Sequence, residues 1–147
     1  MNGKYDIIIN RVIDGDSMDI DIYLGFGVVL KNRRLRLEGI DTPESRTSDE
    51  EEKKYGILAK MFVKNWCGRG DRECHGDHGL FFLVIKSRNN GKETDKFGRI
   101  LGDIENINGE SLVQSILKNY HGVLYEGQSK DDIKKAHLDN RLKLEIT

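Results

Sequence analysis

The sequence predicts a mixed α/β fold, in which a small five-stranded β-barrel carries three α-helices. Two patterns in the sequence support this expectation. Between residues 16 and 24, apolar and polar side chains alternate, as in a strand with one buried face. After residue 50, apolar side chains recur at helical spacing in three separate stretches. The chain has 147 residues, the usual size of one domain, so we expect a single domain over residues 1–147.

The first half of the predicted barrel is a meander of three strands, over residues 5–13, 16–24 and 28–40. The turn signals between them are Asp14-Gly15 and Gly25-Phe26-Gly27. The apolar side chains of the second strand share one parity, and they are Met18, Ile20, Ile22 and Leu24. Asp16 has the same parity, so we expect its carboxylate at the end of the core face, where burial without a partner is costly.

Three helices and two further strands complete the prediction. Polar residues 45–54 are expected to form a mobile surface loop, although the first helix could begin as early as Ser48, with Glu51 closing a capping box. The apolar face of this helix would contain Tyr55, Leu58, Ala59, Phe62 and Trp66. The later elements are strands over residues 80–86 and 99–107, a turn at Asn89-Asn90-Gly91, a helix from Leu112 to Tyr120 and a helix that starts at Ser129. The order β-β-β-α-β-β-α-α is typical of an OB-fold barrel.

Composition and charge exclude several classes of protein. Apolar residues make up 37% of the chain, and the formal net charge of −1 provides no overall basic field that would attract nucleic acid. No apolar run is long enough to span a membrane, and two cysteines are too few for a disulfide scaffold. The N-terminus lacks a signal-peptide pattern. We therefore expect an intracellular monomer without membrane contact, or a secreted one if a leader has been removed.

Three short motifs could carry chemistry, namely Asp14-Gly15-Asp16, the stretch from Arg36 to Glu44 and the stretch from Asp95 to Arg99. Taken alone, they could be a hairpin turn, a proline-containing turn and a polar loop that enters a strand. Taken together, they are harder to explain structurally. Asp16 and Asp41 each stand where a strand of the same meander meets a turn. Carboxylates on adjacent turns are ligands that Ca²⁺ or Mg²⁺ prefers.

The other polar residues of these motifs supply the remaining parts of a phosphodiester-hydrolysing site. Glu44 is close enough to Asp41 in sequence to orient or deprotonate a water beside a metal ion. Arg36 and Arg99 can donate to phosphate oxygens and offset the charge that builds up in the transition state. Phosphodiester hydrolysis needs a nucleophilic water, an electrophilic metal and donors to the non-bridging oxygens, and this set offers all three.

These motifs resemble those of the staphylococcal nuclease (thermonuclease) family. The matching stretches are Val12 to Ser17, Arg36 to Glu44 and Asp95 to Arg99, with Gly56-x-x-Ala59 and Leu101-Gly102. The resemblance extends over nearly the whole chain, and the order and spacing of three separate motifs make it specific. It implies an OB-fold barrel with three helices, and a Ca²⁺-dependent nuclease that acts on DNA and/or RNA and leaves 3′-phosphate ends.

The resemblance also implies a role for each matched residue. Asp16 and Asp41 would be the calcium carboxylates, and Thr42 would add its backbone carbonyl. Asp14 would contact these ligands without binding the ion itself. The catalytic residues would be Arg36, Glu44 and Arg99. The residues beside the nucleotide would be Phe97 and Tyr125. Phe97 replaces the tyrosine of many members, which removes a hydroxyl that could bond a nucleotide phosphate, and Ser17 replaces the usual threonine but keeps a hydroxyl.

Several alternatives remain open at this stage. Cys67, Cys74, His75 and His78 could bind zinc, but their spacing matches no common zinc pattern, and a polar loop with free thiols explains them better. The basic side chains of Lys31, Arg33, Arg34 and Arg36 could form a phosphate track or an ordinary solvated strand edge. His121 and His137 are expected on helix faces and not in catalysis. The whole chain could also be a catalytically silent OB-fold module that binds nucleic acid or protein.

Overall fold

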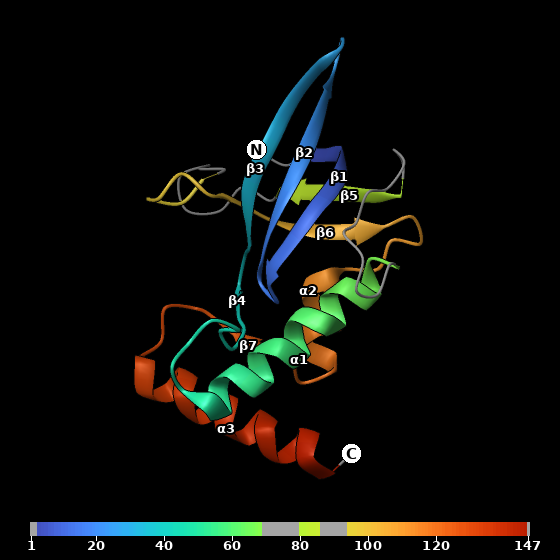
Figure 1. Cartoon of the computed structure of the whole chain (residues 1–147). Helices are drawn as coiled ribbons and strands as arrows, with labels where there is room; N and C mark the ends of the chain where they lie inside the picture. The colour runs from blue at the N-terminus through green and yellow to red at the C-terminus, as the bar shows by residue number, and fades with distance from the viewer. Residues whose placement is uncertain (1–2, 69–79, 86–93, 147) are drawn as a thin grey trace.

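The computed structural model describes residues 3–68, 80–85 and 94–146. In this part of the chain, a closed barrel with the strand order β1-β2-β3-β6-β5 stands above three helices (Figure 1). The barrel strands are β1 (Gly3–Asp14), β2 (Ser17–Gly25), β3 (Val28–Leu37), β5 (Phe81–Ile85) and β6 (Ile100–Asn106). Neighbouring strands are antiparallel except β3 and β6, which are parallel. The predicted OB-type barrel with three helices is therefore confirmed.

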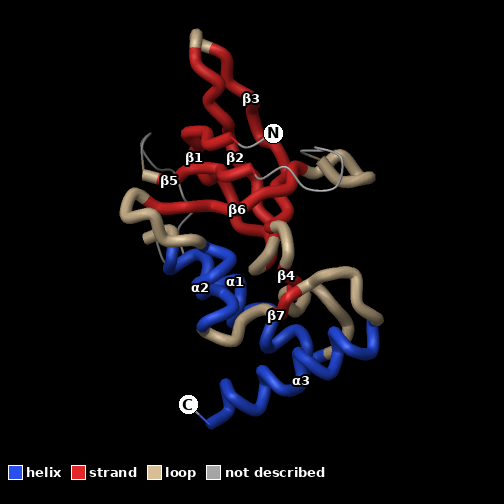
Figure 2. The backbone as a smooth tube through the Cα atoms, turned by 180° about the vertical axis from the view of Figure 1, so that it is seen from behind, coloured by secondary structure: helices blue, strands red, loops and turns tan. Residues whose placement is uncertain are grey.

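The buried face of β2 explains how the barrel forms. Met18 and Ile20 are fully buried and Ile22 is nearly so, as the alternation predicts. Leu24 was expected on the same buried face, but it is 43% exposed. The reason is that β2 and β3 remain paired as far as Gly25 and Val28, and this end of the hairpin projects beyond the barrel (Figures 1 and 2).

The first helix, α1 (Glu50–Trp66), begins at a different cap from the one predicted. Asp49, and not Ser48, is the N-cap, and its carboxylate accepts hydrogen bonds from the backbone N–H groups of Glu51 and Glu52. The predicted loop over residues 45–54 is therefore half helical. Three acidic side chains occupy the first turn of α1, where the helix dipole favours negative charge. The acidic run that suggested a loop is therefore the start of this helix.

Two glycines let α1 approach the strand ends closely. A Cβ atom on Gly56 would lie 2.1 Å from the carbonyl oxygen of Glu44, so only glycine allows this contact. A Cβ atom on Gly15, in the β1–β2 turn, would lie 3.0 Å from the Cβ of Ala59. The first helix is thus fitted against both the β1–β2 turn and the segment that follows Asp41. Leu58, which was expected on the buried face of α1, is 40% exposed.

The remaining elements bring the end of the chain back beneath the barrel. They are β4 (Ile40–Asp41), α2 (Leu112–Lys118), β7 (Val123–Leu124) and α3 (Lys130–Ile146). The two-residue strands β4 and β7, which the sequence did not reveal, pair antiparallel. The predicted buried face of α3, with Ile133, Ala136, His137, Asn140 and Leu144, is confirmed as half-buried. Within the described residues, no helix is both long and apolar enough to cross a membrane.

Candidate functional site

The carboxylate of Asp16 lies at the bottom of the barrel, in the turn between β1 and β2. Asp16 is buried, and its carboxylate accepts hydrogen bonds from the Ser17 hydroxyl (3.0 Å) and from the backbone N–H of Thr42 (3.0 Å). The backbone carbonyl of Asp16 accepts a further bond from the N–H of Leu37 (2.8 Å). These contacts satisfy a buried charge and tie the β1–β2 turn to β3 and to the segment after Asp41.

Arg36 stands between the two aspartates that the sequence singled out. Its Nη2 lies 3.5 Å from Oδ2 of Asp16 and 3.6 Å from Oδ1 of Asp41, and its Nη1 donates to the carbonyl of Leu37 (2.7 Å). The side chain of Arg36 is 16% exposed, that of Asp16 11% and that of Asp41 32%. The carboxylates of Asp16, in the β1–β2 turn, and of Asp41, in β4, therefore both lie beside the same guanidinium, and the structure brings Asp16, Arg36 and Asp41 together as expected.

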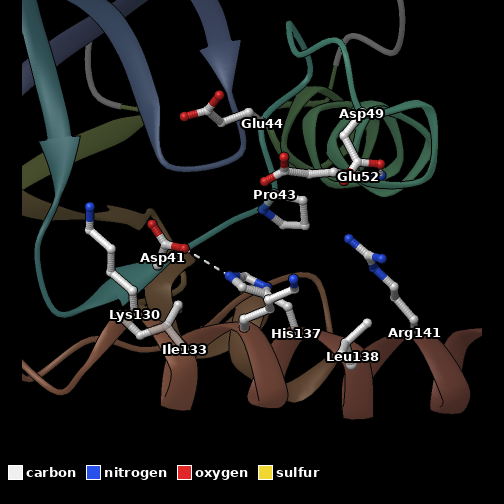
Figure 3. A pocket seen from close by; sticks show the side chains of 11 residues that line it. Asp41, Pro43, Glu44, Asp49, Glu52, Lys130, Ile133, His137, Leu138 and Arg141 are labelled. Carbon is white, nitrogen blue, oxygen red and sulfur yellow. Dashed lines mark hydrogen bonds and ion pairs between the residues drawn. The ribbon is translucent and has the colours of Figure 1, made fainter.

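The other oxygen of Asp41 contacts a residue that sequence reasoning set aside. Oδ2 of Asp41 lies 2.7 Å from Nε2 of His137, on α3, as the dashed line in Figure 3 marks. The side chain of His137 is 12% exposed. Because Oδ2 is held in this way, Oδ1 is the oxygen of Asp41 that faces Arg36 and Asp16. His137 was expected to be a helix-face residue only, and this contact adds it to the site.

Glu44 follows on the same loop, which Asp14 anchors. The carboxylate of Asp14 accepts hydrogen bonds from the backbone N–H of Ser45 (3.1 Å) and from its hydroxyl. The pKa of Glu44 is raised, first by partial desolvation and then by the negative charges of Glu52, Asp14, Asp41 and Asp16. Glu44 therefore lies near enough to the aspartates for their charges to make it a stronger proton acceptor.

Arg99 reaches the same region from the loop before β6. The carboxylate of Asp95 accepts hydrogen bonds from Nε of Arg99 (2.6 Å) and from the backbone N–H groups of Arg99 and Phe97 (2.9 Å each). Although desolvation alone would raise the pKa of Asp95, these bonds and the arginine charge lower it. The Phe97 ring is 71% exposed and lies 5.5 Å from the Arg99 guanidinium carbon. Asp95 thus fixes the arm of Arg99 through Nε, and no other described residue is hydrogen-bonded to its terminal nitrogens.

An open groove of about 640 Å³ joins these residues. Its lining contains Arg36, Asp41, Arg99 and Tyr125, whereas Phe97 lies outside it. Tyr125 follows β7, its side chain is 47% exposed, and its backbone N–H donates to the carbonyl of Gly39 (2.9 Å). The groove therefore presents two arginines and one aromatic ring on the same surface, together with the acidic side chains of Glu38, Asp41, Asp95 and Glu126. Asp95 is paired with Arg99, and the arginines and the ring suit a phosphate attached to a base or sugar.

A second hollow, of about 530 Å³, lies on the other side of Asp41, between the loop that carries Glu44 and the helix α3 (Figure 3). One wall is acidic, with Glu44, Asp49 and Glu52. The other wall is mostly basic, with Lys130, Lys134 and Arg141. Asp41 is the residue that lines both hollows. It therefore stands at the centre of the candidate site, with the phosphate-type groove on one side and Glu44 on the other.

The donor set fits a hard divalent cation. No group of three or more His, Cys, Asp or Glu residues among the described residues converges on a metal-binding point. Two carboxylates do converge, however, and a cationic guanidinium already lies between them. Ca²⁺ takes backbone carbonyls, waters and phosphate oxygens as well as carboxylates, so two carboxylates and the nearby Thr42 backbone suffice for the protein's share. Cys74, His75 and His78 of the zinc alternative lie outside the described residues, and Cys67 is buried.

Three supporting residues were not recognised in the sequence, namely Ser45, Asp95 as a partner of Arg99, and His137. Asp95 lies four residues before Arg99, so a local ion pair could have been anticipated. The contacts of Ser45 and His137 bridge 31 and 96 residues of chain, and no local pattern identifies such partners.

Comparisons with known proteins bear on this site. The family described as staphylococcal nuclease homologue matches residues 34–144, which include Arg36, Asp41, Glu44 and Arg99. The endonuclease YhcR of Bacillus subtilis (strain 168) is 25% identical, over 84% of this chain and 9% of the relative's own length. The chain thus spans a small part of that relative. Since the family match covers most of the sequence, and since the motifs and the barrel agree with it, the chain belongs to the family of staphylococcal nuclease homologues.

Proposed function

We propose that the chain is a Ca²⁺-dependent nuclease that hydrolyses phosphodiester bonds of DNA and/or RNA and leaves 3′-phosphate ends. The main support is the position of the Arg36 guanidinium, within 3.6 Å of one oxygen of Asp16 and one oxygen of Asp41. A hydrogen-bond donor for phosphate and two hard oxygen ligands thus meet at the edge of a groove that also contains Arg99. The relative's name, endonuclease, is in keeping with this activity.

The ion would be held by the carboxylates of Asp16 and Asp41 and by the backbone carbonyl of Thr42. When bound, Ca²⁺ supplies Lewis-acid polarisation of a phosphoryl oxygen. Asp14 and His137 would position these ligands. Asp14 anchors the loop at Ser45, and His137 holds one oxygen of Asp41 so that the other faces Asp16.

Glu44 would accept a proton from the attacking water, because its raised pKa makes it a better base than an ordinary surface carboxylate. The water oxygen then forms a bond to phosphorus, the bond from phosphorus to the 5′-oxygen breaks, and the 5′-oxygen leaves as a hydroxyl after taking up a proton from solvent water. Because the bond to the 5′-oxygen is the one that breaks, the phosphate stays on the 3′-oxygen of the neighbouring fragment.

Arg36 and Arg99 would donate hydrogen bonds to the non-bridging oxygens, where negative charge builds up. The carboxylate of Asp95 accepts from Nε of Arg99 and not from its two Nη groups, which would grip the phosphate as a fork. Tyr125 would lie beside the nucleotide in the groove, and Phe97, which packs near Arg99, would contact its outer edge.

A digestion assay tests the proposal. Purified protein is incubated with DNA and with RNA, in calcium and in a calcium chelator, and the products are tested for 3′-phosphate by their resistance to polymerase extension before phosphatase treatment. We expect cutting in calcium only, with blocked 3′ ends. Equal background cutting in both buffers would reject the proposal.

A catalytically silent binding module is the alternative, and Glu44→Gln separates the two. If Glu44 is the base, the variant loses most turnover but still binds calcium and nucleotide, because the ligands and both arginines remain. A pure binding module would show no turnover in the parent protein and unchanged binding in the variant.

A further inference from the structure

The tip of the β2–β3 hairpin is the most exposed apolar feature of the described chain outside the candidate site. Phe26 is 105% exposed at the turn, and it is flanked by Leu24 (43% exposed) and Val28 (50% exposed). Figures 1 and 2 both show the hairpin projecting away from the barrel and the helices. The fully exposed Phe26 gives the fold no buried area, so packing does not explain an aromatic residue at this position.

The backbone at the tip makes Phe26 more unusual. Gly25, Phe26 and Gly27 all have positive φ, of 87°, 56° and 76° respectively. A left-handed conformation suits glycine or asparagine, and a bulky aromatic residue there is an outlier. The turn would therefore form more easily with another residue at position 26. Phe26 combines a strained backbone with a fully exposed ring, and this combination suggests that the ring binds a partner.

The chemistry of β3 indicates the class of ligand. Basic side chains continue from the tip towards the candidate site through Lys31, Arg33, Arg34 and Arg36, and the first three are exposed. Lys31 and Arg34 are paired with Asp21 (3.4 Å) and Asp19 (2.6 Å), but their side chains remain 69% and 46% exposed. A basic strand between an exposed aromatic ring and a phosphate-binding arginine is complementary to a polyanion that also carries flat rings.

The length of the hairpin sets the size of the ligand. From Arg36 to Phe26 the strand covers about 33 Å at roughly 3.3 Å per residue. In duplex DNA each strand has one phosphate per roughly 3.4 Å of helix axis, and an unstacked single strand is longer per nucleotide, so this distance corresponds to at most about ten nucleotides. A short oligonucleotide could therefore fill the groove at Arg36 without reaching the tip.

We propose that the β2–β3 hairpin is a nucleic-acid-binding arm, in which β3 follows the phosphates and Phe26 stacks on a base at most about ten nucleotides from the bond that is cut. The proposal rests on the proposed function for the position of the cut bond. It does not rest on that function for binding itself, which needs neither calcium nor turnover.

Phe26→Asn is the informative variant, because asparagine tolerates the left-handed backbone and should leave the hairpin folded. Binding is measured by fluorescence anisotropy in chelator, with single-stranded DNA of about 30 nucleotides and of about four nucleotides, lengths on either side of the reach of the arm. Loss of one stacked base should weaken binding of the long probe by between about fivefold and 150-fold. Binding of the short probe should not change.

Two further variants act as controls. Phe26→Trp keeps a stacking ring and should retain long-probe binding. Ile107→Asn removes another exposed apolar side chain at a turn, away from the hairpin, and should also retain it. Equal binding of the long probe by Phe26→Asn and the parent protein would overturn the proposal. So would loss of sedimentation with anionic vesicles in Phe26→Asn together with unchanged DNA binding, because that result would assign the tip to a membrane surface.

The outcome is separable from that of the proposed function. If the parent protein cuts neither DNA nor RNA in calcium, the proposed function fails, but the anisotropy comparison in chelator still decides whether the arm binds nucleic acid. If the parent cuts both lengths of DNA, Phe26→Asn should lower kcat/KM for the long substrate and leave it unchanged for the short one.

Discussion

The contact between His137 and Asp41 can be tested by replacing His137 with leucine. The two side chains meet at 2.7 Å, and the histidine is 12% exposed. A hydrogen bond to a charged acceptor is worth about 1.5–3 kcal/mol, and part of this is recovered when water reaches Asp41, which is 32% exposed. We therefore expect the free energy of unfolding in chelator to fall by about 1–2 kcal/mol.

The same change should weaken calcium binding by about tenfold to 100-fold, the usual effect of losing a partner that orients a metal ligand. Without His137, Oδ2 of Asp41 is no longer held, and Oδ1 is no longer directed towards Asp16. Isothermal titration with calcium, without substrate, measures the affinity directly. His137→Gln places a side-chain N–H near the former Nε2 and should restore much of that affinity.

Asn140→Leu is the matched control for a purely structural effect. Asn140 lies on the same face of α3, and its side-chain amide donates to the carbonyl of Gly122 (3.0 Å). Loss of this bond should weaken the packing of α3 and leave the hydrogen bond between His137 and Asp41 in place. If His137→Leu and Asn140→Leu lower stability equally and leave calcium affinity unchanged, His137 only anchors the helix. If His137→Leu instead binds calcium more tightly, the histidine competes with the ion and does not position its ligand.

Three other predictions follow from the described contacts. Desolvation would raise the pKa of Asp21, but hydrogen bonds from Asn32 and Asn10 lower it. Asp21→Asn should therefore reduce the free energy of unfolding at pH 7. In urea titrations, the difference in stability from the parent protein should shrink as the pH falls through the lowered pKa. Gly56→Ala should be destabilising by circular dichroism melting, by about 2 kcal/mol or more, because the added Cβ would meet a backbone oxygen at 2.1 Å; a neutral or stabilised variant would show that α1 tolerates displacement. Asp95→Asn should release Arg99 and lower kcat by about tenfold or more while calcium affinity stays constant, and an unchanged kcat would show that Arg99 does not need Asp95 to position it.

The barrel could be predicted from the sequence because its signals are local. The alternation of Met18, Ile20 and Ile22 is sufficient to define the buried face of β2, and the glycine-containing turns define where the strands of the meander reverse. The exposed tip could not be predicted from the same alternation. Parity indicates which face Leu24 is on, but it does not indicate whether another element covers that face, and here the strands extend past the barrel.

The residues that the barrel contributes to the candidate site were easier to predict than those that α3 contributes. Asp16 lies in the turn before β2, Arg36 lies in β3 and Asp41 follows shortly after β3, so the expected hairpins already place them near one another, and the structure brings the two carboxylates to the Arg36 guanidinium. Arg99 joins them because β6 pairs in parallel with β3, which matches Arg36 with Leu101 and follows from the closure of the barrel. The order of strands in an OB-type barrel was therefore enough to bring the third motif to the first two.

The contribution of α3 needed the structure. Helical periodicity correctly placed His137 on the half-buried face with Ile133 and Asn140, but a periodic pattern contains no information about which surface that face will cover. The covering depends on the short pairing of β4 with β7, two residues on each side, which positions the chain before α3 directly behind Asp41. Such a short strand pair has no distinct sequence signal. A histidine on an amphipathic helix therefore cannot be assigned to solvent, core or site until the element beneath it is known, and in this chain that element carries a candidate metal ligand.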